Sequence, residues 1–179
     1  MSQKILLTAK EVNIILHRLA CQLIEKHLDF SNTVLIGLQP RGKFLAERIK
    51  HILGTEYHVK SIQLGFLDIT FFRDDFRRGE KQLEANKTQI DFLVEDKKVL
   101  FIDDVLHTGR SINAALTAIQ SFGRPSEVEL LTLIDRRFSR HLPIQPDYRG
   151  RQVDAINNEK VKVCWQENDG EDAVFLITN

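Results

Sequence analysis

The residues best suited to chemistry lie in one short stretch, in which two adjacent carboxylates, Asp103 and Asp104, follow an apolar run. The run at 99–102 predicts a buried strand. A turn of small and hydroxyl residues at 108–111 leads directly into a helical pattern at 112–119. A strand, a small-residue loop and a helix start favour phosphate binding, because successive backbone N–H groups and the helix dipole meet at one point.

The side chains of this stretch limit which ligands would fit. Gly109 lets the backbone approach a ligand closely, and the hydroxyls of Thr108 and Ser111 can donate to phosphate oxygens. Carboxylates beside a phosphate favour a ligand that also carries hydroxyl donors or a divalent cation, as a ribose 5-phosphate does. The alternative is an acidic strand end that only caps a helix. The predicted ligand-binding residues are Asp103, Asp104, Val105, Leu106, His107, Thr108, Gly109, Arg110 and Ser111.

The elements that must position these residues alternate along the chain. A capping box, Thr8 to Glu11, opens the first predicted helix. Strand–helix alternation predicts an α/β fold with a central, mostly parallel sheet flanked by helices, and ligands at the carboxyl ends of its strands. The expected helices cover residues 12–24, 44–53 and 112–122, and the expected strands cover 33–38, 61–69, 99–102, 128–134, 161–165 and 173–178.

Three other segments follow predicted strands and should border the same crevice. The turn Pro40-Arg41-Gly42 is a second small-residue junction, and its arginine suits a second phosphate such as pyrophosphate. Residues 70–97 lack a period and predict a lid, with Arg73, Asp74 and Asp75 closing over pyrophosphate and Mg²⁺. The alternative for this loop is a solvated charged hairpin. Asp135-Arg136-Arg137 follows the strand predicted to end at 134 and is the third such segment.

Bulk composition agrees with a single-domain enzyme spanning residues 1–179. The 25 Lys and Arg balance the 25 Asp and Glu, which argues against a general polyanion binder but not against a local basic patch. Cys21 and Cys164 show no paired spacing, as expected in a reducing cytoplasm. No signal peptide or long apolar run is present, so we expect no membrane association.

Residues 103–111 resemble the phosphoribosyl pyrophosphate (PRPP) motif of the type I phosphoribosyltransferases, two acidic residues followed by Thr-Gly and a hydroxyl residue. Nearly the whole chain resembles a narrower group, the pyrimidine operon regulator/uracil phosphoribosyltransferase (PyrR) family. The segments that carry this resemblance, in chain order, are Asp68-Ile69-Thr70, Phe72-Arg73-Asp74-Asp75, Asp103 to Arg110, Ser121-Phe122-Gly123-Arg124-Pro125, Asp135-Arg136, Leu142-Pro143-Ile144 and Asp147-Tyr148.

The resemblance implies a type I phosphoribosyltransferase fold with a flexible lid and a small C-terminal hood, expected over about 136–165 plus parts of the N-terminal segment. It implies that uracil and PRPP give UMP and pyrophosphate with Mg²⁺, in a homodimer or higher homo-oligomer. Many members also bind the leader RNA of pyrimidine operons when UMP is high. Asp135, Arg136, Arg137 and Val163 would then face the base.

Breaking the bond between C1 and pyrophosphate places positive charge on the ribose ring. Arg41, backbone N–H groups and Mg²⁺ would neutralise the leaving pyrophosphate. Asp103 and Asp104 would hold the ribose hydroxyls and contact Mg²⁺ indirectly, the metal being held mainly by PRPP. His107 can accept a proton near neutral pH and so could take the N1 proton of uracil, or it only lines the phosphate loop.

The sequence departs from the family most where RNA would bind. A Thr and a His of the regulators' first helix correspond to His17 and Cys21 here, and Lys26 and Arg151 replace an Arg and a Lys. A local basic cluster could contact RNA phosphates or be a solvated face. The residues predicted to contact RNA are His17, Lys26, Arg140, Arg149 and Arg151, and Arg136 and Arg137 add to the basic cluster.

Three functions therefore remain open. The first is a uracil phosphoribosyltransferase, with or without RNA-dependent regulation. The second is an RNA-binding transcriptional attenuator that uses the nucleotide site only as a UMP sensor. The third is a phosphoribosyltransferase for a purine base.

Overall fold

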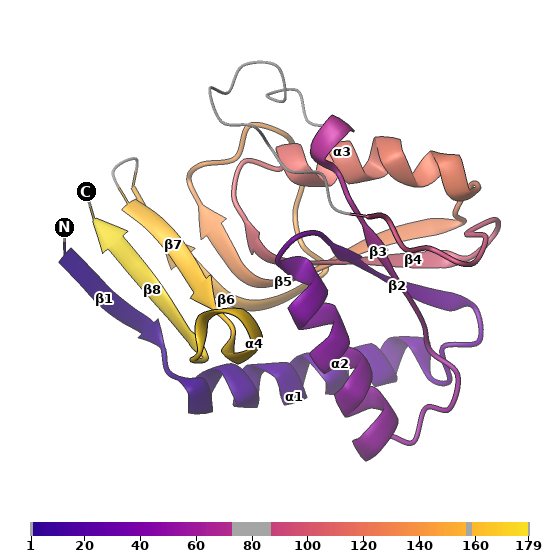
Figure 1. The fold of residues 1–179 in the computed structure, drawn as a ribbon, viewed down its shortest axis with the longest axis horizontal. Coiled ribbons are helices and arrows are strands. Elements are labelled where there is room, and N and C mark those ends of the chain that lie inside the picture. The colour runs from indigo at the N-terminus through magenta and orange to yellow at the C-terminus, as the bar shows by residue number, and fades with distance from the viewer. Residues whose placement is uncertain (1, 73–86, 157–158, 179) are drawn as a thin grey trace.

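The computed structural model describes residues 2–72, 87–156 and 159–178, which form one large and one small β-sheet (Figure 1). The large sheet has five strands in the order β3-β2-β4-β5-β6, all parallel to their neighbours. This arrangement confirms the predicted parallel α/β architecture. The strands are β2 (Thr33–Leu38), β3 (Gln63–Leu67), β4 (Lys98–Leu106), β5 (Glu127–Arg137) and β6 (Tyr148–Asp154).

Helices cover both faces of the large sheet. α1 (Ala9–His27) and α2 (Gly42–Glu56) pack on one face, and α3 (Arg110–Ile119) packs on the other, followed by a short 3-10 turn, η2 (Gln120–Phe122) (Figure 1). Successive side chains of β4 enter opposite cores, as strand geometry requires: Leu100 packs toward α1 and α2, whereas Phe101 packs toward α3. Burial on both faces explains why the central strands are continuous apolar runs.

The small sheet lies beside the large one and contains both ends of the described chain (Figure 1). It is antiparallel, in the order β1-β8-β7, with β1 (Ser2–Leu7), β7 (Glu159–Cys164) and β8 (Ala173–Thr178). A one-turn helix, α4 (Gln166–Asp169), joins β7 to β8. We call these three strands and α4 the hood.

The hood is expected over about 136–165 plus parts of the N-terminal segment, and the small sheet does combine β7 with β1. β6 lies within that range but pairs in parallel with β5 in the large sheet, and β8 lies outside it. β6 is an edge strand in which only Tyr148 and Val153 are buried, so its sequence shows no apolar run. β1 was also not predicted from the sequence. Its first four residues are all exposed, so they show no alternation of buried and exposed positions.

The segment expected to form the lid is described only in part. A 3-10 turn, η1 (Thr70–Phe72), follows β3, and Gln89 forms an isolated antiparallel bridge with Phe66. Arg73, Asp74 and Asp75 lie outside the described residues. Their predicted role over pyrophosphate therefore stays a prediction.

A buried polar cluster joins α1 to the start of β5 and β6. His27 Nε2 lies 3.0 Å from Glu129 Oε2, and its Nδ1 lies 2.9 Å from Thr33 Oγ1. The Tyr148 hydroxyl donates to Glu129 Oε2 over 2.8 Å. Burial lowers the pKa of His27 although Glu129 opposes the shift. The neutral imidazole is therefore the form that fits the folded protein.

We expect the free energy of unfolding to fall as the pH drops below about 6.5, the unperturbed histidine value. The unfolded chain then binds a proton that folded His27 resists, so the loss approaches ~1 kcal/mol per pH unit. Urea denaturation at pH 7.5, 6.5 and 5.5 measures it. A His27→Gln variant should show a flatter pH dependence over this range. Equal slopes in both proteins would contradict the assignment.

Candidate active site

The acidic pair lies in the C-terminal half of β4, which continues to Leu106 and so extends past the predicted strand end at 102. The two aspartates have different surroundings. Asp104 is only 8% exposed, and burial raises its pKa against the opposing effect of Arg41. Asp103 is half-buried, and its Oδ1 accepts a hydrogen bond from the backbone N–H of Asp104 over 2.9 Å. Asp104 therefore depends on a neighbouring cation, whereas Asp103 remains partly open to solvent.

The second predicted phosphate turn lies directly against this pair. Arg41 Nε donates to Asp104 Oδ2 over 3.2 Å. Gly42 begins α2 so close to β4 that a Cβ atom there would lie 2.4 Å from the carbonyl oxygen of Ile102 and 3.0 Å from Asp103 Cα. The glycine is thus required by backbone contact. It brings the turn Pro40-Arg41-Gly42 and the acidic pair into one site.

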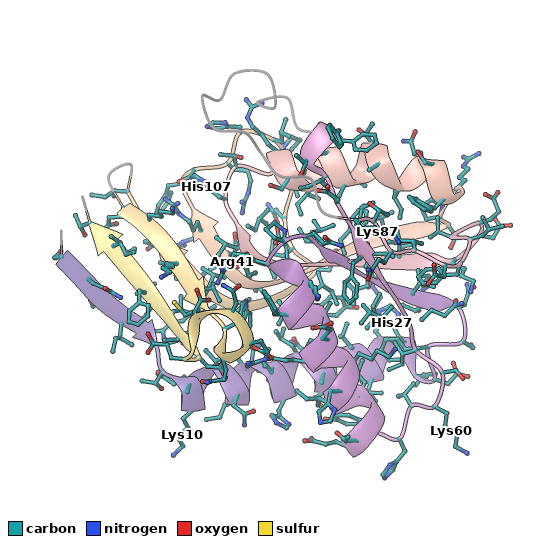
Figure 2. The ribbon with its side chains drawn as sticks, in the orientation of Figure 1. Lys10, His27, Arg41, Lys60, Lys87 and His107 are labelled. Atoms are coloured by element: carbon teal, nitrogen blue, oxygen red, sulfur yellow. The ribbon has the colours of Figure 1, made fainter. Side chains whose placement is uncertain are left out.

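Arg41 also connects this site to the hood. Its Nη2 donates to Asp169 Oδ2 over 2.8 Å and to the backbone carbonyl of Val163. Figure 2 shows Arg41 between the start of α2 and the hood. Val163 was predicted, and it enters the site through its carbonyl because its side chain is buried. Asp169 was missed, because nothing in the local pattern of this polar stretch links it to a residue 128 positions away.

The predicted phosphate loop is the turn at 108–111, and it runs into the N-terminus of α3 at Arg110. Gly109 has a φ of +90° and caps the helix without any side-chain hydrogen bond. The carbonyl of Thr108 accepts from the backbone N–H groups of His141 and Leu142, over 2.9 and 3.3 Å. The β5–β6 connection thus shapes the loop. The first N–H groups of a helix have no partner within it, which makes this end suited to an anion.

A cavity of about 740 Å³ lies between the phosphate loop and the hood, a size typical of ligand sites. Figure 2 labels His107 beside the hood. Burial lowers the pKa of His107, and the charges of Arg136, His141 and Arg140 lower it further. The imidazole is therefore neutral at pH 7. The lining residues are Val105, His107, Thr108, Arg136, Phe138, Ser139, Arg140, His141, Glu159, Lys160 and Val161.

Of the three consecutive residues predicted to face a base, only Arg136 lines this cavity. Arg136 is buried, and its Nη2 donates to the carbonyl of Glu159 over 3.0 Å. Arg137 instead forms an exposed ion pair with Asp154 at 2.5 Å. Arg137 does not line this cavity, because successive side chains of a strand point to opposite faces.

Asp135 is 3% exposed and does not line the cavity; it makes structural contacts. It accepts a hydrogen bond from Arg140, and Arg140 also donates to the backbone carbonyl of His107. Arg149 lies 3.7 Å from the other carboxylate oxygen. Asp135 therefore holds Arg140 in place, and Arg140 in turn supports the phosphate loop.

The residues predicted to contact RNA do not form a single free surface. His17 lies 3.0 Å from Glu56, and Lys26 forms an ion pair with Glu129. Arg140 belongs to the phosphate-loop contacts above. Only Arg149 and Arg151 remain together, both exposed on β6.

A third arginine joins them from α1. Arg18 donates to the carbonyls of Arg149 and Gly150, over 3.2 and 2.6 Å. Arg151 donates to the carbonyl of Leu6 over 2.9 Å. We call Arg18, Arg149 and Arg151 the basic group; Arg18 was missed because its position on a solvent-facing helix surface carries no signal of its neighbours.

No group of three or more His, Cys, Asp or Glu side chains able to hold a metal ion occurs among residues 2–72, 87–156 and 159–178. The carboxylates of Asp103 and Asp104 fit the way Mg²⁺ binds in phosphate-transfer sites, through one or two carboxylates plus substrate phosphates. Within the described ranges, no helix combines the length and apolar character needed to span a bilayer.

Comparisons with known proteins agree with this geometry. The family model for the phosphoribosyl transferase domain matches residues 2–168. The Bifunctional protein PyrR of Desulfosudis oleivorans is 42% identical over 172 residues, covering 96% of this chain and 94% of the relative. The Bifunctional protein PyrR of Acetivibrio thermocellus is 45% identical over 163 residues, covering 89% of this chain and 85% of the relative.

Solved structures show the same fold at low identity. A hypoxanthine phosphoribosyltransferase of Trypanosoma cruzi aligns with a TM-score of 0.73 and 17% identity, covering 98% of this chain and 91% of that one. A hypoxanthine phosphoribosyltransferase of Staphylococcus aureus aligns with a TM-score of 0.69 and 20% identity, covering 98% and 92%. With the parallel sheet, the two strand-end turns and the acidic pair at one edge, these matches show that the chain belongs to the phosphoribosyl transferase domain family and, within it, to the PyrR family.

Proposed function

We propose that the protein transfers the phosphoribosyl group of PRPP to uracil, giving UMP and pyrophosphate. The observation that carries this proposal is the contact between Arg41 and Asp104, which joins the two strand-end turns in one site. One turn offers the helix N-terminus of α3 to a 5-phosphate, and the other offers an arginine to pyrophosphate. The PyrR relatives support uracil as the base over a purine.

The residues divide the reaction between them. The backbone N–H groups at Gly109 and Arg110 bind the 5-phosphate, and Asp103 and Asp104 accept hydrogen bonds from the ribose hydroxyls. Negative charge on Asp104 also favours the positive charge that develops on the ribose ring. Mg²⁺ would be held mainly by PRPP, with indirect contact to these carboxylates, and would neutralise charge on the pyrophosphate.

The base is expected in the cavity beside His107 and Arg136. His107 has the lowered pKa of a neutral acceptor, which suits removal of the N1 proton of uracil near neutral pH. The competing role, a histidine that only lines the phosphate loop, predicts the same geometry. A His107→Gln variant separates the two roles. If His107 accepts the proton, kcat of the wild type falls at low pH as the imidazole is protonated, and the variant loses this fall.

Turnover with a panel of bases tests the proposed substrate. With PRPP and Mg²⁺, we expect UMP from uracil, and no nucleotide from hypoxanthine, guanine or orotate. Nucleotide formation is followed by chromatography. Nucleotide from hypoxanthine or guanine alone would establish the purine alternative. Protein that binds UMP but forms none from uracil and PRPP would favour the sensor alternative.

A second function, binding of pyrimidine-operon leader RNA, has its own support. The basic group of Arg18, Arg149 and Arg151 is exposed beside the hood, and the relatives are described as bifunctional. Arg149 lies 3.7 Å from Asp135, whose partner Arg140 supports the phosphate loop. Nucleotide binding at the loop therefore has a physical route to this surface. We expect UMP to strengthen RNA binding, and linkage then requires RNA to strengthen UMP binding by the same factor.

Replacing Arg149 and Arg151 by alanine should weaken RNA binding and leave uracil turnover nearly intact, because neither residue lines the cavity. Each lost phosphate contact should reduce the slope of log K against log salt by about 0.7 to 0.9. Filter binding across a salt series, with and without UMP, measures both effects. Arg137→Ala is the matched control, since Asp154 already neutralises that arginine. No UMP-dependent, salt-sensitive binding at micromolar protein would show a member that kept the enzyme alone.

A further inference from the structure

Two arginines, Arg41 at the N-cap of α2 and Arg48 within the helix, are held by Asp169 of α4 and by Asp172 just before β8. Arg41 Nη2 donates to Asp169 over 2.8 Å, and Arg48 donates to Asp172 from Nη1 and Nη2 over 2.9 and 2.7 Å. Each aspartate also accepts a backbone hydrogen bond at α4, Asp169 from Trp165 over 2.9 Å and Asp172 from Gln166 over 2.8 Å. Both pairs therefore fasten the hood to α2.

The two pairs differ in what the arginine does next. Beyond Asp172, the Arg48 guanidinium contacts only hood side chains among the described residues, donating to Glu167 and lying over the ring of Trp165. Arg41 instead donates through Nε to Asp104 of the acidic pair. Only the Asp169–Arg41 pair thus forms a continuous connection, from the hood to the carboxylate that is expected to contact the ribose.

The contacts of Arg41 leave one side of its guanidinium available. Nε is held by Asp104, and Nη2 is held by Asp169 and the carbonyl of Val163. Nη1 makes no hydrogen bond to any residue within 2–72, 87–156 or 159–178. Because the guanidinium is planar and rigid, fixing Nε and Nη2 also fixes the direction of the Nη1 donors.

We propose that Asp169 is a positioning residue that orients Arg41, so that its Nη1 group binds the pyrophosphate of PRPP. This inference rests on the proposed function. The backbone N–H of Trp165 and the charge of Arg41 lower the pKa of Asp169, so it stays a carboxylate at neutral pH. Asp169 does not touch substrate; it acts by holding the guanidinium that does.

The matched aspartates allow a controlled experiment. We expect Asp169→Ala to weaken PRPP binding about tenfold, as loss of a hydrogen bond to a charged group does. The affinity for UMP, which lacks pyrophosphate, should not change. Asp172→Ala should alter neither affinity. Isothermal titration calorimetry with PRPP and with UMP, at saturating Mg²⁺, measures all of these values.

Two further measurements separate positioning from folding. Trp165 is the single tryptophan and is fully buried against Arg48, so unchanged fluorescence emission in both variants reports an intact hood. Asp169→Asn keeps an acceptor for Arg41 and the Trp165 N–H, and should therefore recover part of the PRPP affinity. Recovery of this kind supports a role through Arg41.

Several results would overturn the inference. Equal weakening of PRPP binding by both alanine variants would make Asp169 a general anchor of the hood. An equal loss of PRPP and UMP affinity would exclude a role specific to pyrophosphate. Tighter PRPP binding would mean that the carboxylate only repels the ligand. If Asp169→Ala changed only the Mg²⁺ concentration needed for PRPP binding, Asp169 would act at the metal and not through Arg41. Wild-type protein that binds PRPP without using uracil would count against the proposed base alone.

Discussion

Asp104→Asn should lower kcat by about a hundredfold, the usual cost of removing one preorganised charge contact to a transition state. The variant keeps the shape of the side chain and loses the negative charge that faces Arg41. Positive charge on the ribose ring would then develop beside a neutral amide. Because the contact matters most in the transition state, the KM for PRPP should change much less than kcat.

Steady-state kinetics with uracil and PRPP at saturating Mg²⁺ measures this effect. Asp154→Asn is the matched control, since it also removes the acid from a carboxylate–arginine pair, Asp154 with Arg137, but on the exposed surface. That variant should keep wild-type turnover. If kcat of the Asp104→Asn enzyme stayed within threefold of wild type, the carboxylate would have only a structural role at the strand end.

Gly42→Ala should reduce kcat/KM by at least about a hundredfold, because displacing a positioned group by ~1 Å costs that much. The added Cβ would lie 2.4 Å from the carbonyl oxygen of Ile102 and 3.0 Å from Asp103 Cα. Both are backbone atoms of a central strand, so the start of α2 must move instead, and Arg41 moves with it. We also expect a loss of roughly 1–3 kcal/mol in the free energy of unfolding, as for overpacking of a core.

Gly54→Ala provides the control within the same helix. Its Cβ would meet nothing closer than the carbonyl oxygen of Val59 at 4.0 Å. Replacing glycine by alanine in a helix should then stabilise the protein by roughly 0.5–1 kcal/mol and leave activity unchanged. Urea denaturation and uracil turnover on both variants check the pair of predictions. Equal activity in the two variants would contradict the close approach of α2 to β4.

The sequence was most informative where the physical cause is local. Residues 99–112 combine a buried strand, an acidic pair, a glycine turn and a helix start within one short stretch, so their order along the chain is also their order in space. The capping box of Thr8 and Glu11 is confirmed for the same reason, with the Thr8 N–H donating to Glu11 over 2.8 Å. Strand–helix alternation predicted the parallel sheet because crossover connections require it.

The sequence was least informative where solvent exposure hides a strand, where neighbouring side chains alternate in direction, or where a partner is distant in the chain. β6 places Arg149 and Arg151 in solvent, so its few buried residues do not reveal a strand. Arg137 follows a predicted strand end, but strand geometry turns its side chain away from the cavity that Arg136 lines. Lys26 has the charge expected of an RNA contact, and the acidic Glu129 that engages it is 103 residues away in the chain.

By itself, the sequence determined the fold class, the phosphate loop, the acidic pair and the family, because each depends on residue types at short spacing. Only the tertiary structure decided how these parts meet. The hood combines β1 from the start of the chain with β7 and β8 from its end, and it places Asp169 and the Val163 carbonyl on Arg41. Contacts over such separations depend on how two sheets pack against α2, and no local period of the chain encodes that packing.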